Sequence, residues 1–257
     1  MTDFSQINQQ PLSQTVLVML REAIISGQLK PGQPLIQAKI AAQFGVSRGP
    51  LREALNRLEE EGFIKTIPYK GSAVAPLTRQ NVDELRSLRN MLEEFAGQLI
   101  IANAQPQHLQ EVESIYARMR DAAEAGDIDA VDALDLSLHQ RICELSGHSL
   151  LIEVWNRYAN QFRRVLTFTN RVNHDLQLIV TMHAPLLDAL RVGDRASLHD
   201  FYQNHGTDLS AYLPVNWQED GIWEDGELEG AGEESTLLEM TGPDNRVMDL
   251  LSRSGVS

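Results

Sequence analysis

Four residues in the second half of the chain have the types and spacing to bind a divalent metal ion. Asp135 and His139 lie four positions apart in a helical pattern, so both side chains can reach one ion. His183 and His205 fall in two later helical segments, which bring them together if the segments pair antiparallel. One oxygen and three imidazole nitrogens suit one Zn²⁺, Ni²⁺, Mn²⁺ or Fe²⁺ per protomer and leave coordination positions open. The alternative is coincidence, because the chain contains seven histidines.

A second set of polar residues shares one face of a helix that is predicted after Val46. Arg48, Arg52 and Asn56 follow one another at intervals of four. The apolar residues of the same segment fall on a different face: Leu51, Leu55 and Leu58. A helix that presents guanidinium and amide groups outward is suited to reading DNA. An ordinary helical hairpin with solvated arginines fits the periodicity equally well.

The residues just upstream predict the first helix of a helix-turn-helix. Ile40, Ala41 and Phe44 make a short apolar stripe, and Gly45 ends that helix with a positive φ. Ser47 is the expected N-cap of the next helix, with its hydroxyl accepting the Gly49 amide.

Two short strands are predicted after this helix, at residues 64–68 and 73–76. Lys70 and Gly71 fall at the tip of the hairpin between them. Lys70 can reach a phosphate or a minor groove there, which we favour, or it is simply solvated.

From Thr78 the chain changes to long amphipathic patterns, which predict an all-helical bundle. The six expected helices cover residues 79–103, 107–125, 128–146, 148–170, 174–192 and 195–213. The domains are thus a flexible arm at 1–10, a DNA-binding domain at 11–78, a helical domain at 79–213 and a tail at 214–257. The tail is acidic and aperiodic, and we expect it to be disordered.

Charge and composition agree with this division. The net charge of −14 argues against nucleic-acid binding as a whole, but residues 1–78 carry +2, residues 79–213 carry −7 and residues 214–257 carry −9. Only the first segment can face phosphates. Cys143 is the single cysteine, which excludes an internal disulfide and a Cys-rich zinc site. No stretch of 18 apolar residues and no signal-peptide pattern occurs, so we expect a cytoplasmic protein without a membrane partner.

The segment KPGQPLIQAKIAAQFGVSRGPLREALNRLEEEGFI closely resembles the DNA-binding domain of the GntR family of bacterial transcription regulators. The resemblance implies a winged helix-turn-helix with Arg48 and Arg52 at the principal DNA-contacting positions. Relatives commonly have a basic residue where this chain has Ala38, and Lys39 replaces it only in part. The full set of expected DNA contacts is Lys39, Ser47, Arg48, Gly49, Arg52, Asn56, Lys70 and Gly71.

Segments of the helical region, among them DLSLHQRICELSGHSLL and TMHAPLLDALRVGD, resemble the effector domain of the FadR subfamily. Its metal-containing branch implies one divalent cation held by Asp135, His139, His183 and His205. Arg89 matches the Arg-x-x-x-Glu of the first helix, where it either holds a ligand carboxylate or forms an ion pair with Glu93. In place of His148 relatives carry a helix-capping Asn, which implies a structural role.

Together these features predict a homodimeric transcription regulator that binds a short palindromic operator on double-stranded DNA. A small carboxylate, an organic or sugar acid, is expected to bind beside the metal and change operator affinity. One alternative is a metal-sensing repressor, in which the ion is the effector. The other is a metal-dependent hydrolase, although no general base is evident and the helix-turn-helix would be unexplained.

Overall fold

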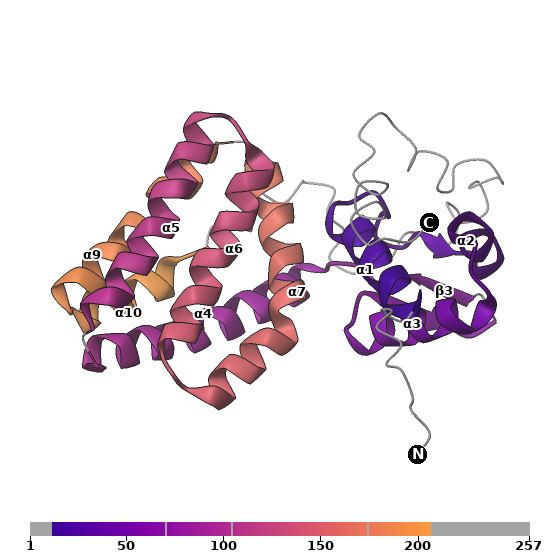
Figure 1. The fold of residues 1–257 in the computed structure, drawn as a ribbon, viewed down its shortest axis with the longest axis horizontal. Helices are drawn as coiled ribbons and strands as arrows, with labels where there is room; N and C mark the ends of the chain where they lie inside the picture. The colour runs from indigo at the N-terminus through magenta and orange to yellow at the C-terminus, as the bar shows by residue number, and fades with distance from the viewer. Residues whose placement is uncertain (1–11, 70, 104, 174, 207–257) are drawn as a thin grey trace, which may run out of the picture. The chain divides into compact units, whose positions relative to one another are not determined.

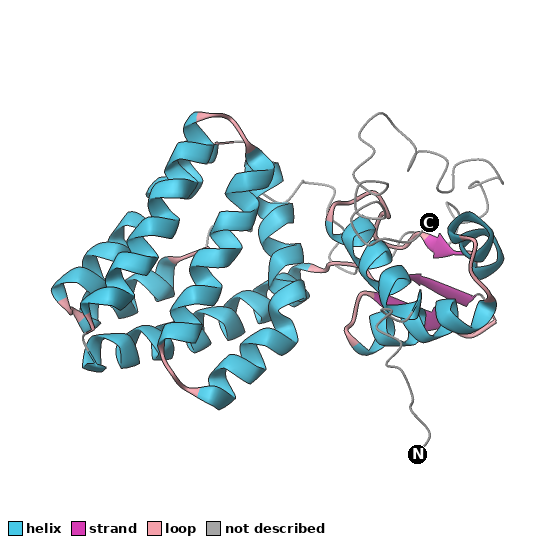
Figure 2. Cartoon of the chain, in the orientation of Figure 1, coloured by secondary structure: helices cyan, strands magenta, loops and turns pink. Residues whose placement is uncertain are grey.

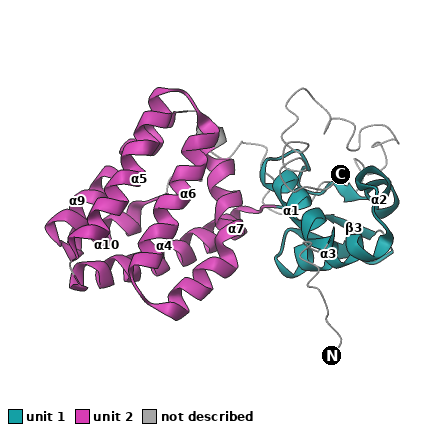
Figure 3. Cartoon of the chain, in the orientation of Figure 1, with its two compact units in different colours: residues 1–76, 220–257 teal, residues 77–219 magenta. Residues whose placement is uncertain are grey.

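The structure is a computed structural model, which describes residues 12–69, 71–103, 105–173 and 175–206. The described chain divides into two compact units, residues 12–76 and residues 77–206 (Figure 3). The predicted arm at 1–10 and tail at 214–257 lie outside the described residues. No helix in the described part is long and apolar enough to cross a membrane.

The first unit is a winged helix-turn-helix of three helices and a small sheet (Figure 1). Its elements are α1 Leu12–Ile25, β1 Pro34–Leu35, α2 Gln37–Phe44, α3 Arg48–Glu60, β2 Ile64–Ile67 and β3 Gly71–Val74. The strands pair antiparallel in the order β1-β3-β2. In the β2–β3 hairpin Ile64 lies opposite Val74, and Ile67 lies opposite Gly71. Sequence analysis missed β1, because two residues are too short for any periodic pattern.

The helix-turn-helix prediction is confirmed: the predicted apolar face of α3 is buried and its predicted polar face is exposed. Leu51, Leu55 and Leu58 of α3 are buried with Ile40 of α2 in one core cluster. Gly45 takes the left-handed conformation that ends α2, with φ 61° and ψ 28°. The three-residue turn therefore rests on a conformation that glycine adopts without strain.

The prediction that the Ser47 hydroxyl accepts a capping hydrogen bond is wrong. Ser47 is the N-cap of α3 with extended backbone, but its hydroxyl makes no capping hydrogen bond. An N-cap side chain normally accepts the amide of the second or third helical residue. Here the third residue is Pro50, which has no amide hydrogen, and the Gly49 amide is not used.

The second unit is entirely helical in its described residues (Figure 2). Its helices are α4 Arg79–Asn103, α5 Pro106–Glu124, α6 Ile128–Leu145, α7 Ser149–Asn173, α8 Leu176–Thr181, α9 Ala184–Val192 and α10 Arg195–Asn204. Helices α5 and α6 lie side by side, and α6 also packs on α4 and α7. One apolar cluster fills the space between them, with Leu138, Leu186 and Leu198 fully buried. The predicted fold class is confirmed.

Two predicted helices end differently from expectation. The expected helix at 174–192 is two helices, α8 and α9, separated at Met182–His183. Pro185, in the first turn of α9, cannot donate a backbone hydrogen bond to the preceding turn, so the ladder is interrupted. The expected helix at 195–213 ends at Asn204, because His205 is extended and Gly206 has φ 73°.

The turn of the helix-turn-helix yields a stability prediction. Replacing Gly45 with Ala should lower the free energy of local opening of α2 and α3 by about 1–2 kcal/mol, because a Cβ disfavours the left-handed conformation. Hydrogen exchange of the α3 amides in the full chain measures this. Gly49→Ala is the matched control: an added Cβ meets no atom within 4 Å and α3 is helical there, so protection should stay equal or rise. Unchanged protection in Gly45→Ala would contradict the assignment.

Candidate functional site

The four predicted metal ligands meet inside the helical unit. Asp135 and His139 project from one face of α6, as their spacing predicts. His183 is the N-cap of α9 and His205 is the C-cap of α10, so the two later ligands stand at helix ends rather than within helices. All four side chains are buried.

The distances between the ligand atoms suit a single ion. Nε2 of His183 lies 3.3 Å from Nε2 of His139. Oδ1 of Asp135 lies 3.1 Å from Nε2 of His183 and 3.4 Å from Nε2 of His139. His139, His183 and His205 each offer a ring nitrogen within 4.8 Å of the others. Atoms bound to one ion at about 2.0–2.2 Å are themselves roughly 3.0–3.4 Å apart, which matches the three shorter separations.

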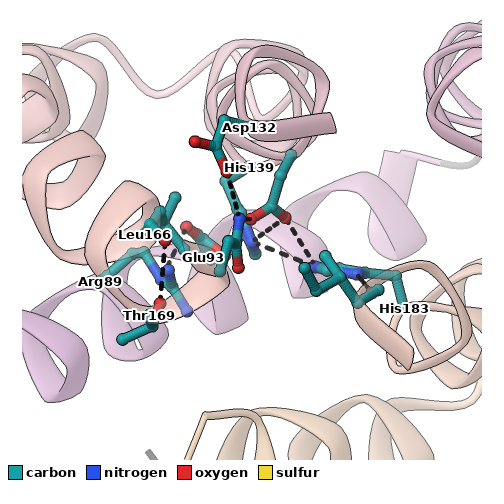
Figure 4. Close-up of polar contacts among 10 residues, drawn as sticks. Arg89, Glu93, Asp132, His139, Leu166, Thr169 and His183 are labelled. Carbon is teal, nitrogen blue, oxygen red and sulfur yellow. Dashed lines mark hydrogen bonds and ion pairs between the residues drawn. The ribbon is translucent and has the colours of Figure 1, made fainter. Parts of the chain in front are cut away.

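Neighbouring groups orient two of the imidazole rings. Nδ1 of His139 lies 2.6 Å from Oε2 of Glu93, and Nδ1 of His183 lies 2.8 Å from the carbonyl oxygen of Ile179. Both partners are acceptors, so the Nδ1–H group of each ring points to its partner and Nε2 is turned toward the cluster. In many proteins a metal-binding histidine is oriented in this way, with the ring nitrogen that does not bind the metal donating to a carboxylate or a backbone carbonyl. Figure 4 shows Glu93 and His139 beside one another, with His183 beyond them.

Asp135 completes this arrangement as a buried acceptor. Its Oδ2 accepts a hydrogen bond of 3.2 Å from the Asn170 amide. Its Oδ1 is buried without a hydrogen-bond partner. A buried carboxylate oxygen without a donor is costly unless a cation satisfies it. The residues present therefore fit a divalent ion between Asp135 and the three histidines.

The pKa directions follow from this packing. Burial alone would raise the pKa of Asp135, but its contacts with His139 and His183 hold that pKa well below the ordinary value. Burial would lower the pKa of His139, whereas the Glu93 carboxylate raises it above the ordinary value. Burial and then the neighbouring His183 lower the pKa of His205 well below its ordinary value. A lowered pKa favours the neutral imidazole that metal binding requires.

Arg89 faces the same site from α4. A pocket beside the cluster is lined by Arg89, Asp135, Leu166, Thr169, Asn170, Ile179, Met182, His183, His205 and Gly206. Nε of Arg89 lies 3.7 Å from Oε1 of Glu93, which makes an ion pair but not a hydrogen bond. Arg89 thus pairs with Glu93 and also lines the cavity, while its expected role in holding a ligand carboxylate stays a prediction. The buried Nε keeps a donor available for an anion.

The remaining described histidines have other roles. Nδ1 of His148 accepts the Leu151 amide at 3.1 Å, so it caps the start of α7 as the resemblance implies. His199 is exposed on α10 and pairs with Glu94 at 2.9 Å. His108 lies on α5 away from the cluster, and His174 lies outside the described residues.

Sequence reasoning missed several residues that support the ligands. Glu93 was visible only as the partner of Arg89, although it holds His139. The Asn170 amide donates to Asp132 at 3.0 Å as well as to Asp135, and thereby ties α7 to α6. Asn90 bonds the end of α10. No local spacing could reveal these contacts, because each joins residues more than 30 positions apart.

The expected DNA contacts lie on the surface of the first unit. Those described are exposed: Lys39, Ser47, Arg48, Gly49, Arg52, Asn56 and Gly71. Among the described residues, Arg48 and Arg52 have no ion-pair partner. Gly71 begins β3 at the hairpin, with φ 88°. Lys70 lies outside the described residues, so its expected contact stays a prediction.

A winged helix-turn-helix and a helical domain with a buried ligand cluster define a class of DNA-binding regulators that carry a ligand domain on the same chain. Residues 12–74 match the bacterial regulatory proteins of the gntR family, and residues 84–208 match the FCD domain. The chain therefore belongs to the GntR family, with an FCD effector domain. It is a DNA-binding transcription regulator.

Three relatives illustrate this similarity. A probable D-xylose utilization operon transcriptional repressor from Paenarthrobacter nicotinovorans is 29% identical over 213 residues, which cover 80% of this chain and 91% of that protein. The gluconate operon transcriptional repressor of Bacillus subtilis is 28% identical over 191 residues, covering 72% and 78%. The solved structure of E. coli McbR/YncC aligns with a TM-score of 0.62 and 25% identity, covering 79% of this chain and 99% of that one. These relatives are regulators, so the hydrolase alternative is dropped.

The cluster predicts a measurable metal content. Purified protein should contain about one divalent ion per protomer. His183→Ala or His205→Ala should bind the ion more weakly and lose it during purification, because each removes a nitrogen ligand. An ion bound only to the folded state stabilises it, so chelation should lower the melting temperature. Elemental analysis and calorimetry measure both. His199→Ala, which removes an exposed histidine outside the cluster, should retain the ion. A wild-type protein that has no metal and does not respond to Zn²⁺, Ni²⁺ or Mn²⁺ would refute the site.

Proposed function

We propose that this protein is a homodimeric transcription regulator whose operator affinity is controlled by a small carboxylate bound beside a divalent metal. One observation carries the proposal: Asp135, His183, His205 and the buried Arg89 line the same cavity. Metal ligands with open positions and an adjacent guanidinium are together suited to a carboxylate.

One divalent ion per protomer, Zn, Ni, Mn or Fe, is proposed at Asp135, His139, His183 and His205. When bound, the ion would supply a positive centre with coordination positions left for oxygen ligands. Glu93 and the Ile179 carbonyl keep the rings of His139 and His183 oriented toward it. The apolar side chains of Ile179 and Met182 line the same cavity.

The effector is proposed to be an organic or sugar acid. Arg89 is the cationic side chain among the cavity residues, and its Nε has no hydrogen-bond partner. The helical domain has a net charge of −7, which repels anions. An anion is therefore favoured only next to a cationic side chain such as Arg89. The gluconate repressor among the relatives is named for a sugar acid, which agrees with this class.

For DNA binding, helix α3 is proposed to enter a major groove. Arg48, Arg52 and Asn56 would face the bases and phosphates, with Lys39, Ser47 and Gly49 near the backbone and the hairpin residues Lys70 and Gly71 as the wing. Two copies of such a unit read a short palindrome. Exposed apolar side chains on adjacent helices of the second unit support a homodimer: Met91 and Phe95 on α4, and Leu150, Val154 and Tyr158 on α7.

Ligand binding would act by shifting the population of domain arrangements. A carboxylate changes operator affinity only if it binds these arrangements with different strength. Helix α4 is the natural element to transmit this difference, since it follows the first unit directly in the sequence, starting at Arg79. It also carries Arg89, which lines the cavity, and Glu93, which pairs with Arg89.

The DNA-binding face is tested by Arg52→Ala. The substitution should weaken specific operator binding by roughly 1–3 kcal/mol per half-site, because a bidentate base contact is lost. The fold should persist, since Arg52 is exposed. Gel-shift titration at fixed salt measures the loss. Arg57→Ala is the matched control: it removes the same charge from the same helix, but Arg57 points elsewhere and bonds Gln14 at 3.0 Å. Equal losses in both variants would show nonspecific electrostatics instead of base reading.

The effector site is tested by calorimetric titration of one responsive carboxylate into wild type, His183→Ala and metal-stripped protein. His183→Ala should lower carboxylate affinity at least tenfold and blunt the DNA response, while operator binding without ligand survives. Coupling is reciprocal, so a carboxylate that weakens operator binding must bind less tightly when operator is present.

Two results would redirect the proposal. Equal carboxylate affinity in all three proteins would place the effector elsewhere and leave the metal a structural role. A DNA response to metal alone, with no response to any carboxylate of a panel, would favour the metal-sensing repressor, in which the ion itself is the effector.

A further inference from the structure

The ligand His205 stands in an unusual position for a fixed metal ligand. It follows the last residue of α10 and has extended backbone, with φ −66° and ψ 116°. One backbone hydrogen bond, from its amide to the Phe201 carbonyl at 2.7 Å, attaches it to the helix. The carbonyl groups at a helix C-terminus have no partner within the helix. Something outside α10 must therefore hold this end in place.

Asn90 of α4 makes that contact. Its Nδ2 donates to the Tyr202 carbonyl at 2.8 Å and to the His205 carbonyl at 3.0 Å. Both bonds are buried, and the side chain of Asn90 is only 6% exposed. One amide nitrogen thus satisfies two carbonyl groups at the end of α10, and one of them belongs to the ligand residue itself.

We infer that Asn90 is a positioning residue for the metal site, which fixes the backbone of His205 so that its ring reaches the other ligands. The inference rests on the metal site of the proposed function. Outer partners of metal ligands change metal affinity by about 10- to 100-fold when removed. Asn90 acts at the backbone of its ligand, whereas Glu93 acts at the ring of His139.

The chemistry of the side chain makes this role separable from plain stability. Leu has the same number and branching of side-chain heavy atoms as Asn but no donors, so Asn90→Leu leaves both carbonyl groups without the amide. The Oδ1 of Asn90 is buried without a partner, and Leu also removes that unsatisfied acceptor. These effects on stability oppose each other, whereas the effect on His205 has one direction.

Asn90 also gives α4 a third connection to the site. Arg89 lines the cavity, Glu93 bonds His139, and Asn90 between them bonds the segment of His205. A change at the ligand cluster therefore alters the contacts of three nearby residues on one helix. This turn of α4 is therefore where binding or loss of the metal would change the position of the helix.

The test measures Zn²⁺ affinity of the full chain by competition with a chromogenic chelator. The variants are Asn90→Leu, His205→Ala and the double variant, with Gln98→Leu as control. Gln98 lies on the same helix and donates its amide to Glu94 at 3.1 Å, away from the cluster. Asn90→Leu should weaken Zn²⁺ binding at least tenfold, and Gln98→Leu should stay within twofold of wild type. The double variant should bind no more weakly than His205→Ala, because both changes act through one ligand.

Distinct results would overturn the inference. If Asn90→Leu binds Zn²⁺ within twofold of wild type, Asn90 has no positioning role, although the metal site and the proposed function stand. If the double variant loses Zn²⁺ affinity by the product of the two single-variant factors, Asn90 likewise does not act through His205. If wild type binds no Zn²⁺, Ni²⁺ or Mn²⁺, the metal part of the proposed function fails, and the inference fails with it.

A measurement without metal completes the test. Hydrogen exchange at the His205 amide of chelator-treated protein should be faster in Asn90→Leu than in wild type and Gln98→Leu, because the end of α10 loses its outside partner. Equal exchange would contradict the inference. If Asn90→Leu does not fold, Asn90→Ser, which keeps one shorter donor, replaces it and should lie between wild type and His205→Ala in Zn²⁺ affinity.

Discussion

The helical domain depends on the compensation of two carboxylates, Asp135 and Glu93, that are buried in its interior. Glu93 is fully buried and Asp135 is 2% exposed. A buried charge is tolerated only when it is paired and hydrogen-bonded. Glu93 meets His139 and Arg89, whereas Asp135 meets Asn170 and two histidine rings. These contacts join α4, α6, α7 and His183 at the start of α9, so the polar centre fixes where the apolar faces must pack.

This constraint also explains why α4 is more than a packing helix. Its buried polar side chains lie within little more than one turn, at Arg89, Asn90 and Glu93. An apolar core of the same volume would tolerate small shifts of α4 along its axis. Hydrogen bonds of defined length to His139 and to the His205 carbonyl do not, since they weaken steeply with distance and angle. A ligand of the proposed kind that changes the cluster would therefore change the preferred position of α4.

What could be predicted from the sequence depended on the range of the interaction. The i, i+4 pair Asp135 and His139 and the split faces of α3 are local, and they were confirmed. The break before α9 was missed because the apolar pattern continues across it, and Pro185 is tolerated in a first turn. Asn90 gave no signal, since its partners are 112 and 115 residues away. The gathering of the four ligands followed from resemblance and not from spacing, because only tertiary packing brings His183 and His205 to α6.

The arginines proposed to contact anions differ in burial. Arg48 and Arg52 stand exposed on α3, where a guanidinium stays hydrated until a phosphate or a base replaces water. Arg89 is 4% exposed, so its charge has little access to bulk water, and the Glu93 carboxylate lies 3.7 Å from its Nε. That separation is longer than a hydrogen bond, so the guanidinium can still donate hydrogen bonds to a carboxylate that comes closer. A ligand that takes this place competes with Glu93 for Arg89, and Glu93 in turn holds His139. In the proposed function, the effector, the proposed metal ligands and α4 would thereby be linked through the single buried carboxylate of Glu93.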